Sequence, residues 1–483
     1  MRPVSNLKRI STGDAALDGI LSGGIPAQAV TVLAGEPGTG KTVLALQMLF
    51  NAARQGKKSL YFTSIAEPPT KLFRYMETFS FFDPRLLEQY ITFVDLGDSL
   101  QQGPIRTLQR IMAQIEHDEP AIVVIDSFRA VGEMLNLDEG KGRSFVYELA
   151  VQMSGWGATS LLVGEYTLED LRQEAVFGIA DSIIRVRNER QDLTTVREVE
   201  VMKLRGSDYI SGQHFFEITT KGWTCYPRVR APYEQDPEVI PERLTTGVAG
   251  LDDLLGGGIP RSSSTIVQGG TGTGKTLLSL SFLVEGARRG EPGIFFALEE
   301  SPAQLRTLAA ACGWDLPALE ASGLLFLSYA SPVELSTDRY LQVAREQVRS
   351  HGARRVVFDS LTSMGLGVPS DRRFRELVYA LTKHLRLLGA TLFMTVESMQ
   401  LLGTNTLAAP GGVSFAADNI LQLRYVEAGG RLERALSVLK ARGIRHSTEL
   451  RSMTISEQGV AVAIQRFKDL RGVLTGLAST DKE

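Results

Sequence analysis

Two glycine-rich segments of this chain carry the residue types that bind the phosphates of a nucleoside triphosphate. Residues 35–42 read GEPGTGKT and residues 269–276 read GGTGTGKT, so both fit the pattern G-x-x-x-x-G-K-[ST]. Glycines let successive backbone N–H groups surround a phosphate, the lysine reaches the β- and γ-phosphate oxygens, and the threonine hydroxyl can bind Mg²⁺. The expected nucleotide-binding residues are Gly35, Gly38, Thr39, Gly40, Lys41, Thr42, Gly269, Gly272, Thr273, Gly274, Lys275 and Thr276.

A carboxylate ends a mostly apolar, strand-like run in each half of the chain. Asp126 follows AIVVI, and Asp359 follows RVVF. An aspartate at the end of such a strand orients Mg²⁺ and its waters beside the phosphates. Together with Thr42 and Thr276, these two aspartates form the expected magnesium sites.

A pair of glutamates distinguishes the second half. Glu299 and Glu300 end another apolar run, where a carboxylate can polarise a water or a hydroxyl toward the γ-phosphate. Alignment of the two halves places Ile65 and Ala66 opposite these glutamates. Glu67 lies one residue after the aligned pair. We therefore expect the second half to carry the catalysis.

The whole chain is a tandem repeat. Lys41 and Lys275 lie 234 residues apart (275 − 41), and the sequence GGIP recurs at the same offset, at 23–26 and 257–260. So constant an offset indicates that a whole domain has been duplicated.

Each copy alternates short apolar runs with longer amphipathic segments, as parallel strands and their crossover helices do. The runs expected to be buried parallel strands are 29–34, 60–63, 121–125 and 160–163 in the first copy and 264–268, 293–297, 355–358 and 391–394 in the second. The pattern predicts a doubly wound α/β fold, with ligands at the carboxyl ends of the strands. Four prolines in residues 226–241 favour an extended connector, so we expect one domain over 1–234 and another over 235–483.

The composition is that of an ordinary soluble globular protein. Of 483 residues, 43% are hydrophobic and 22% are charged, and the net charge is −3. This charge creates no general attraction for nucleic acid or an acidic membrane. No apolar run approaches the roughly 18 residues of a membrane span, and no signal peptide is recognisable. Cys225 and Cys312 fit no metal-ligand spacing, so we expect buried free thiols and a cytoplasmic location.

Several motifs together resemble the KaiC family of tandem RecA-like ATPases and autokinases of the bacterial clock. They are the two phosphate loops, LEESP at 298–302, the repeated K-x-R-G at 203–206 and 440–443, and FKDLRGVLTG at 467–476. The resemblance covers nearly the whole chain. It implies two RecA-like P-loop NTPase domains, ATP and Mg²⁺ as cofactors, a homohexamer that forms a double ring, and a KaiB-like or signalling protein as partner.

The resemblance also assigns residues that act across a subunit boundary. Those that match the family's groups near the neighbouring subunit's γ-phosphate are Lys440, Arg442 and His446 in the second half and Lys203 and Arg205 in the first. Cationic groups in such an arrangement stabilise a transferred phosphate only after the subunits have assembled.

One serine matches the family's phosphate acceptors. The kinase half of the family carries adjacent serine and threonine acceptors; here Ser414 keeps the first, whereas Phe415 replaces the second. We therefore expect a single phosphorylated residue rather than an ordered two-site cycle. The chain ends at Glu483, soon after the loop that in the family leads into a longer partner-binding tail, so we expect no activator that acts through such a tail.

Two other functions fit parts of the pattern. RecA-like rings also serve DNA recombination and helicase loading, which need basic or aromatic loops, but the candidate loop 400–412 contains no lysine or arginine. A scaffold that uses ATP only to hold subunits together is favoured by Ile65 and Ala66 in the first half and opposed by Glu299 and Glu300 in the second. The resemblance implies an ATPase with serine autokinase activity in clock-like or signalling control.

Overall fold

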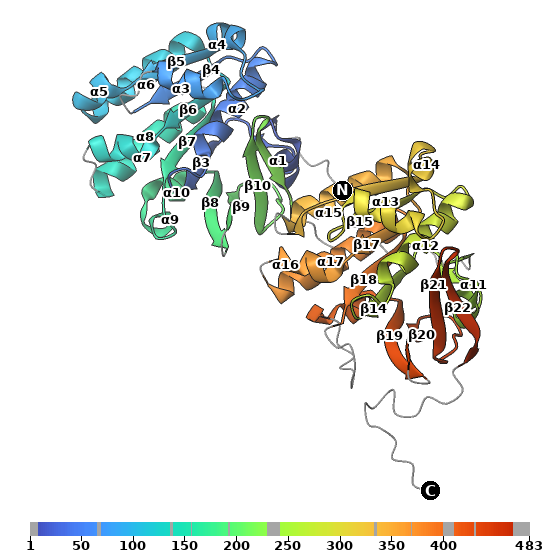
Figure 1. Ribbon diagram of the computed structural model, residues 1–483. Coiled ribbons are helices and arrows are strands. Elements are labelled where there is room, and N and C mark those ends of the chain that lie inside the picture. The colour runs from blue at the N-terminus through green and yellow to red at the C-terminus, as the bar shows by residue number, and fades with distance from the viewer. Residues whose placement is uncertain are drawn as a thin grey trace, which may run out of the picture. The chain divides into compact units, whose positions relative to one another are not determined.

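The computed structural model divides the chain into two compact units, residues 1–228 and 229–483, each of which is described by itself (Figure 1). Some features of the sequence analysis lie outside the residues that the structure describes. They are Ile65, Ala66, Glu67, most of the candidate loop 400–412 and the motif at 467–476. The structure describes residues 8–64, 69–135, 139–155, 157–191, 194–228, 242–332, 336–368, 370–398, 410–428 and 431–466.

Unit 1 is built on a nine-stranded sheet and a short two-stranded one. The strands are β1 (Arg9–Ile10), β2 (Ile25–Pro26), β3 (Val30–Gly35), β4 (Ser59–Thr63), β5 (Ile91–Asp95), β6 (Ile122–Asp126), β7 (Thr159–Glu165), β8 (Ser182–Gln191), β9 (Thr194–Leu204), β10 (Gln213–Thr219) and β11 (Gly222–Tyr226). The large sheet has the order β11-β10-β9-β8-β3-β7-β6-β4-β5. Its strands from β8 to β5 run parallel, and β9, β10 and β11 extend it as antiparallel strands.

Helices cover both faces of this sheet (Figure 1). Residues of α2 pack with one face in a first hydrophobic core, and residues of α6 and α8 pack with the other face in a second core. The helices are α1 (Ala15–Ile20), α2 (Lys41–Ala53), α3 (Pro69–Met76), α4 (Pro84–Tyr90), α5 (Gly97–Gln101), α6 (Pro104–Asp118), α7 (Phe128–Met134), α8 (Glu139–Gly155), α9 (Asp170–Gln173) and α10 (Ala175–Ile179).

Unit 2 repeats this architecture. Its strands are β12 (Arg243–Leu244), β13 (Ile259–Pro260), β14 (Ser264–Gly269), β15 (Gly293–Ala297), β16 (Leu325–Tyr329), β17 (Arg355–Asp359), β18 (Thr391–Glu397), β19 (Asn419–Ala428), β20 (Arg431–Ala441), β21 (Arg451–Ser456) and β22 (Gly459–Arg466). The large sheet has the order β16-β15-β17-β18-β14-β19-β20-β21-β22, which is the order of unit 1 read from the other edge.

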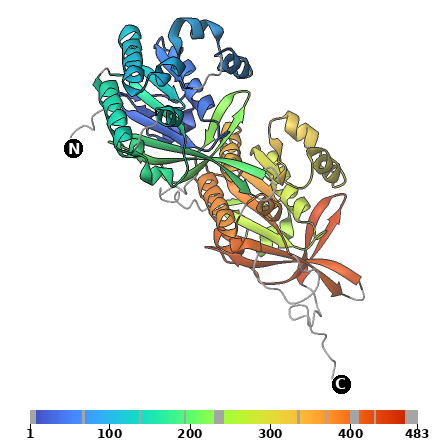
Figure 2. The ribbon, with the colours of Figure 1, turned by 90° about the vertical axis from the view of Figure 1, so that its left-hand side faces the viewer.

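The helices of unit 2 also lie on both faces of their sheet, as the turned view in Figure 2 shows. Residues of α12 line one core, and residues of α15 and α17 line the other. The helices are α11 (Ala249–Leu254), α12 (Lys275–Arg288), α13 (Pro302–Ala310), α14 (Leu316–Ala321), α15 (Thr337–Ser350), α16 (Leu361–Leu366), α17 (Asp371–Leu387) and the 3₁₀ helix η2 (Pro410–Ala416).

The central strands are buried on both faces, which explains their unbroken apolar sequences. All six residues of β3 are buried, and so are all five of β15. A parallel strand covered by helices on both sides has no solvated face to accommodate polar residues. The predicted α/β fold with mostly parallel sheets is therefore confirmed, and the parallel order brings the carboxyl ends of β3, β4, β6 and β7 to one edge of unit 1.

Two smaller expectations concern the thiols and membrane insertion. Cys225 and Cys312 are both buried free thiols, as predicted. Among the described residues, no helix is long and apolar enough to cross a membrane.

Candidate functional site

Each phosphate loop joins a buried strand to an uncapped helix. Helix α2 begins at Lys41, directly after Gly40, which has a φ of 91° and offers no side chain to cap the helix. This positive φ strains any residue with a side chain, and a Cβ on Gly40 would also displace the end of the Ile218 side chain, so the position favours glycine. Gly274 stands in the same position before α12, with a φ of 101°. Both helices therefore present their first backbone N–H groups to an anion.

The two loop lysines point back onto their own loops. Lys41 Nζ donates to the carbonyl oxygens of Gly35 at 2.9 Å and Glu36 at 2.8 Å, and Lys275 Nζ donates to that of Gly270 at 3.0 Å. Burial lowers the pKa of Lys41, and the negative charges of Glu165 and Asp126 partly oppose this shift. A phosphate in the loop would offer these ammonium groups the oxygens that the carbonyls now supply.

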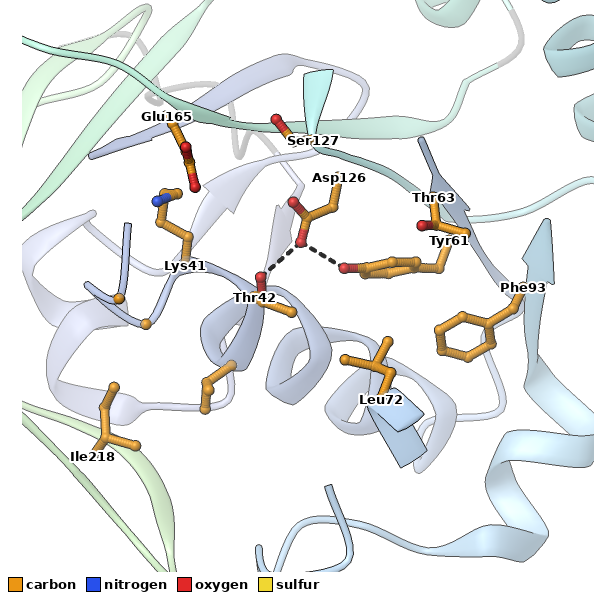
Figure 3. Close-up of a pocket in the computed structure, with 13 residues that line it drawn as sticks. Lys41, Thr42, Tyr61, Thr63, Leu72, Phe93, Asp126, Ser127, Glu165 and Ile218 are labelled. Carbon is orange, nitrogen blue, oxygen red and sulfur yellow. Dashed lines mark hydrogen bonds between the residues drawn. The ribbon is translucent and has the colours of Figure 1, made fainter. Parts of the chain in front are cut away.

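In unit 1 the predicted magnesium residues contact each other. Thr42 Oγ1 donates to Asp126 Oδ2 at 2.8 Å, and the hydroxyl of Tyr61 donates to the same oxygen at 2.6 Å (Figure 3). Burial raises the pKa of Asp126, whereas these two hydrogen bonds lower it. The side chains that would hold Mg²⁺ are thus assembled at the carboxyl end of β6.

These residues line a pocket of about 450 Å³. Figure 3 shows Lys41 beside Glu165 on one side of it, and the side chains of Tyr61, Leu72 and Phe93 on the other. The polar side suits a triphosphate and its metal, and the apolar side offers surface to a less polar part of a ligand.

In unit 2 the aspartate is more deeply buried. Only 2% of Asp359 is exposed, and Thr395 donates a short hydrogen bond to its Oδ1. Burial raises the pKa of Asp359, and the hydrogen bond from Thr395 and the nearby hydroxyl of Thr276 oppose that shift. Thr276 therefore lies near Asp359, but Asp359 Oδ2 is buried and has no hydrogen-bond partner among the described residues, unlike Asp126 Oδ2 in unit 1.

The two glutamates beside this aspartate differ in their contacts. Glu299 Oε1 accepts hydrogen bonds from the hydroxyls of Ser360 and Ser363, which fix its orientation. Glu300 Oε2 is buried and has no hydrogen-bond partner among the described residues. Burial raises the pKa of Glu300, and the negative charges of Asp359 and Glu299 raise it further.

This acidic cluster fits a magnesium–nucleotide complex. An unpaired buried carboxylate oxygen is costly unless a cation or a proton satisfies it. Within the described residues, no group of three or more His, Cys, Asp or Glu forms a complete ligand set. Mg²⁺ commonly binds through one or two protein oxygens together with phosphate oxygens and waters, which is what Thr276 and Asp359 can offer.

The residues expected to act across a subunit boundary lie far from the phosphate loop of their own unit. Lys440 pairs with Ile420 of β19, Ile420 pairs with Ile266 of β14, and the Arg442 N–H bonds the carbonyl of Asp418. Lys440 and Arg442 therefore lie toward the amino end of β14, whereas the loop follows its carboxyl end, roughly 15 Å away at about 3.3 Å per residue. In unit 1, Lys203 is placed likewise, paired with Ile183 beside Val32 of β3.

Ser414 lies at the same amino edge of the sheet in unit 2. It belongs to η2, where Ser264 Oγ at the start of β14 donates to the carbonyl of Ala416 at 2.6 Å. Lys440 Nζ donates to the carbonyls of Ser414 at 3.2 Å and Ala417 at 2.7 Å. The hydroxyl of Ser414 is therefore remote from the Lys275 loop of its own chain.

Comparison with known proteins gives one consistent answer. The family model described as "ATPase: KaiC" matches twice, over residues 10–230 and 244–466. The chain belongs to the KaiC ATPase family. Named relatives include the circadian clock oscillator protein KaiC of Picosynechococcus sp., 30% identical over 98% of this chain and 93% of that protein. The circadian clock protein KaiC3 of Synechocystis sp. is 30% identical over 97% of this chain and 94% of that protein.

Membership of the KaiC family agrees with the two complete phosphate loops, because KaiC domains are ATPase domains. The structure brings together the predicted loop, threonine and aspartate of each unit, and in unit 2 it adds the two glutamates to this cluster. It places Lys203, Arg205, Lys440, Arg442 and Ser414 outside these clusters. His446 lies two residues beyond the turn that follows β20, in a segment without regular structure.

Sequence reasoning missed the side chains that hold the two aspartates. Tyr61 belongs to the apolar run 60–63, which predicts only a buried strand, and Thr395 lies one residue beyond the predicted strand 391–394, although β18 includes it. A signal did exist, because the repeat has Phe295 where the first copy has Tyr61 and Val163 where the second has Thr395.

Proposed function

We propose that this protein is a KaiC-like, ATP-driven hexameric ATPase in which the two units do different work. Unit 2 hydrolyses ATP and phosphorylates Ser414 of an adjoining subunit, whereas unit 1 binds ATP mainly to hold the ring together. The observation that carries the proposal is the pair Glu299 and Glu300 beside Asp359, with one glutamate oxygen unpaired and its pKa raised. A raised pKa suits a carboxylate that must take up a proton near neutral pH.

The roles of the chain's own residues in hydrolysis follow from their positions. The N–H groups at the start of α12 and Lys275 would hold the phosphates, and Thr276 and Asp359 would hold the metal. Bound Mg²⁺ would neutralise charge on the β- and γ-phosphates. The oxygen of the attacking water bonds to the γ-phosphorus, and the bond between that phosphorus and ADP breaks. One of the two glutamates accepts the proton that the water loses.

The proposal assigns Lys440 and Arg442 to the neighbouring subunit's nucleotide. Their place at the amino edge of the sheet supports this, since their own phosphate loop lies at the opposite edge. Cations that arrive only on assembly would couple hydrolysis to ring formation.

Phosphate release after replacement of both glutamates tests the hydrolytic assignment. Glu299→Gln/Glu300→Gln should release phosphate from Mg-ATP roughly 10² to 10⁴ times more slowly, the usual contribution of a general base. Glutamine keeps the size of each side chain and can still accept from Ser360 and Ser363. Normal hydrolysis by this variant would move the chemistry to unit 1, where Glu67 and Glu165 would be the candidate bases.

Mass spectrometry tests the kinase assignment. Incubation with Mg-ATP should add one phosphate, on Ser414, and Ser414→Ala should abolish its incorporation while hydrolysis continues. In the proposed step, the Ser414 oxygen bonds to the γ-phosphorus, ADP leaves, and a glutamate of the adjoining subunit takes the hydroxyl proton. An unmodified Ser414 in an assembled, hydrolysing ring would leave an ATPase without kinase activity.

The same proposal places the protein in clock-like or signalling control, in the cytoplasm, with a KaiB-like or signalling protein as its partner. Two named relatives are circadian clock proteins, which supports this setting. A phosphate on Ser414 would add about −1.5 to −2 charges near other subunits' groups, enough to act as an on/off mark.

A further inference from the structure

The two units hold their metal aspartates with hydroxyl groups from different strands. In unit 1, the donor is Tyr61 on β4, whose hydroxyl lies 2.6 Å from Asp126 Oδ2. In unit 2, the donor is Thr395 on β18, whose hydroxyl donates to Asp359 Oδ1. β4 and β18 flank the aspartate strand on opposite sides, because β6 lies between β4 and β7, and β17 lies between β15 and β18.

Each donor is missing at the equivalent position of the other unit. Tyr61 is the third residue of β4, and Phe295 is the third residue of β15. Thr395 is the fifth residue of β18, and Val163 is the fifth residue of β7, paired next to Asp126. Phe295 and Val163 are fully buried and apolar. In both units, therefore, the aspartate accepts a hydrogen bond from a hydroxyl of one neighbouring strand. That strand lies on one side of the aspartate strand in unit 1 and on the other side in unit 2.

A hydroxyl in this place has a defined physical effect. A donated hydrogen bond fixes the direction of the carboxylate that accepts it. Groups that hydrogen-bond metal ligands in this way typically change metal affinity by about 10- to 100-fold.

We propose that Tyr61 and Thr395 are interchangeable positioning residues that hold the carboxylates of Asp126 and Asp359 in the direction of the metal of the bound nucleotide. The proposal rests on the proposed function only in requiring that each unit bind a metal–nucleotide complex. It needs neither hydrolysis nor phosphorylation.

The test measures metal binding in the full chain, one unit at a time. Lys275→Ala silences unit 2 so that unit 1 can be observed, and Lys41→Ala does the reverse. The probe is Mn²⁺ with ADP, with free Mn²⁺ measured by electron paramagnetic resonance. In the Lys275→Ala chain, Tyr61→Phe should weaken Mn²⁺ binding about tenfold. ADP binding without metal should stay within about twofold, because the phenyl ring keeps the pocket wall.

The exchange variants separate positioning from packing. Adding Val163→Thr to Tyr61→Phe recreates the unit 2 arrangement in unit 1 and should restore Mn²⁺ affinity to within about threefold. In the Lys41→Ala chain, Thr395→Val should weaken Mn²⁺ binding, and Phe295→Tyr should restore it. Unchanged melting temperatures would establish that the variants are folded, and the repeat already accommodates each of the four substituted residue types at these positions.

Three results would overturn the proposal. The first is unchanged Mn²⁺ affinity in Tyr61→Phe and in Thr395→Val. The second is an equal loss of metal-free ADP binding, which would mean that the side chains only shape the pocket. The third is failure of both exchanges in folded proteins. Loss of ATP hydrolysis or of Ser414 phosphorylation would instead contradict the proposed function alone, since Mn²⁺–ADP binding requires neither.

Discussion

Glu300 is a carboxylate whose negative charge the surrounding protein offsets only in part, through a backbone hydrogen bond and the charge of Lys275. Its Oε2 is buried without a hydrogen-bond partner among the described residues, and Asp359 and Glu299 add like charges. An ionised carboxylate in such a place destabilises the folded unit until a cation arrives. Residues that are costly to the free protein and useful with a ligand are typical of functional sites.

Replacement of Glu300 by glutamine should stabilise the metal-free protein. Because the folded-state pKa lies above the ordinary 4.5, the ionised form costs stability at every pH above that raised value. The cost disappears as the pH falls through the folded-state pKa toward 4.5. Glu300→Gln should therefore melt a few degrees higher than the natural chain at pH 8. In a unit of this size, each kcal/mol of added stability raises the melting temperature by about 2 to 4 °C.

The pH dependence of this difference is the check. In differential scanning calorimetry without nucleotide, the difference in melting temperature between Glu300→Gln and the natural chain should narrow as the pH approaches 4.5. Mg-ATP should remove or reverse this difference. Glu346→Gln, an exposed glutamate on α15, is the matched control and should change little. A stabilisation that is absent at pH 8, or that grows on acidification, would contradict the assigned cause.

Individual site residues were predictable only where a local pattern marks them. The phosphate loops and the two aspartates follow from spacing, and the structure brings each set together. Tyr61 and Thr395 could not be identified in this way, because a hydroxyl in a buried strand looks like any other core residue. The difference between the two copies marks these positions, but the register of neighbouring strands is needed to show that their side chains meet the aspartates.

At the scale of elements, the order of parallel strands decides which residues share an edge. The strand ends that carry Asp126 and Glu165 meet beside the loop that follows β3, as the apolar runs predict. The antiparallel strands β9, β10 and β11 were not predicted, although residues 194–204 alternate valines with charged residues. These strands matter because β20, the counterpart of β9, places Lys440 at the amino edge, away from its own loop.

Subunits with complementary defects should restore one another's activity if the site is shared. A Lys275→Ala chain lacks the loop lysine, and a Lys440→Ala/Arg442→Ala chain lacks the cations contributed to the neighbour. Each alone should hydrolyse ATP slowly. In randomly mixed rings, about one interface in four would combine an intact loop with intact cations, because each neighbour is independently one type or the other.

Phosphate release from the mixture should therefore exceed the sum of the two variants measured separately. Mixing each variant with itself at the same total concentration is the control. Strict additivity in rings that have demonstrably exchanged subunits would place all the groups needed for hydrolysis within one chain.

At the scale of the whole molecule, duplication has produced two units of the same topology with different chemistry. Both have a complete phosphate loop with its threonine and aspartate, but the paired glutamates belong to unit 2. A unit that binds a nucleotide and lacks the paired glutamates is suited to assembly, since a ligand bound preferentially by the assembled form stabilises that form. The proposed division of labour follows from this inequality.

Sedimentation velocity with and without Mg-ATP tests that division most directly. The natural chain and Glu299→Gln/Glu300→Gln should both sediment as hexamers with Mg-ATP, although the latter scarcely hydrolyses it. Lys41→Ala should assemble poorly under the same conditions, because unit 1 has lost its hold on the nucleotide that joins subunits. The same monomer for the natural chain with and without Mg-ATP, or normal hexamers from Lys41→Ala, would contradict the account.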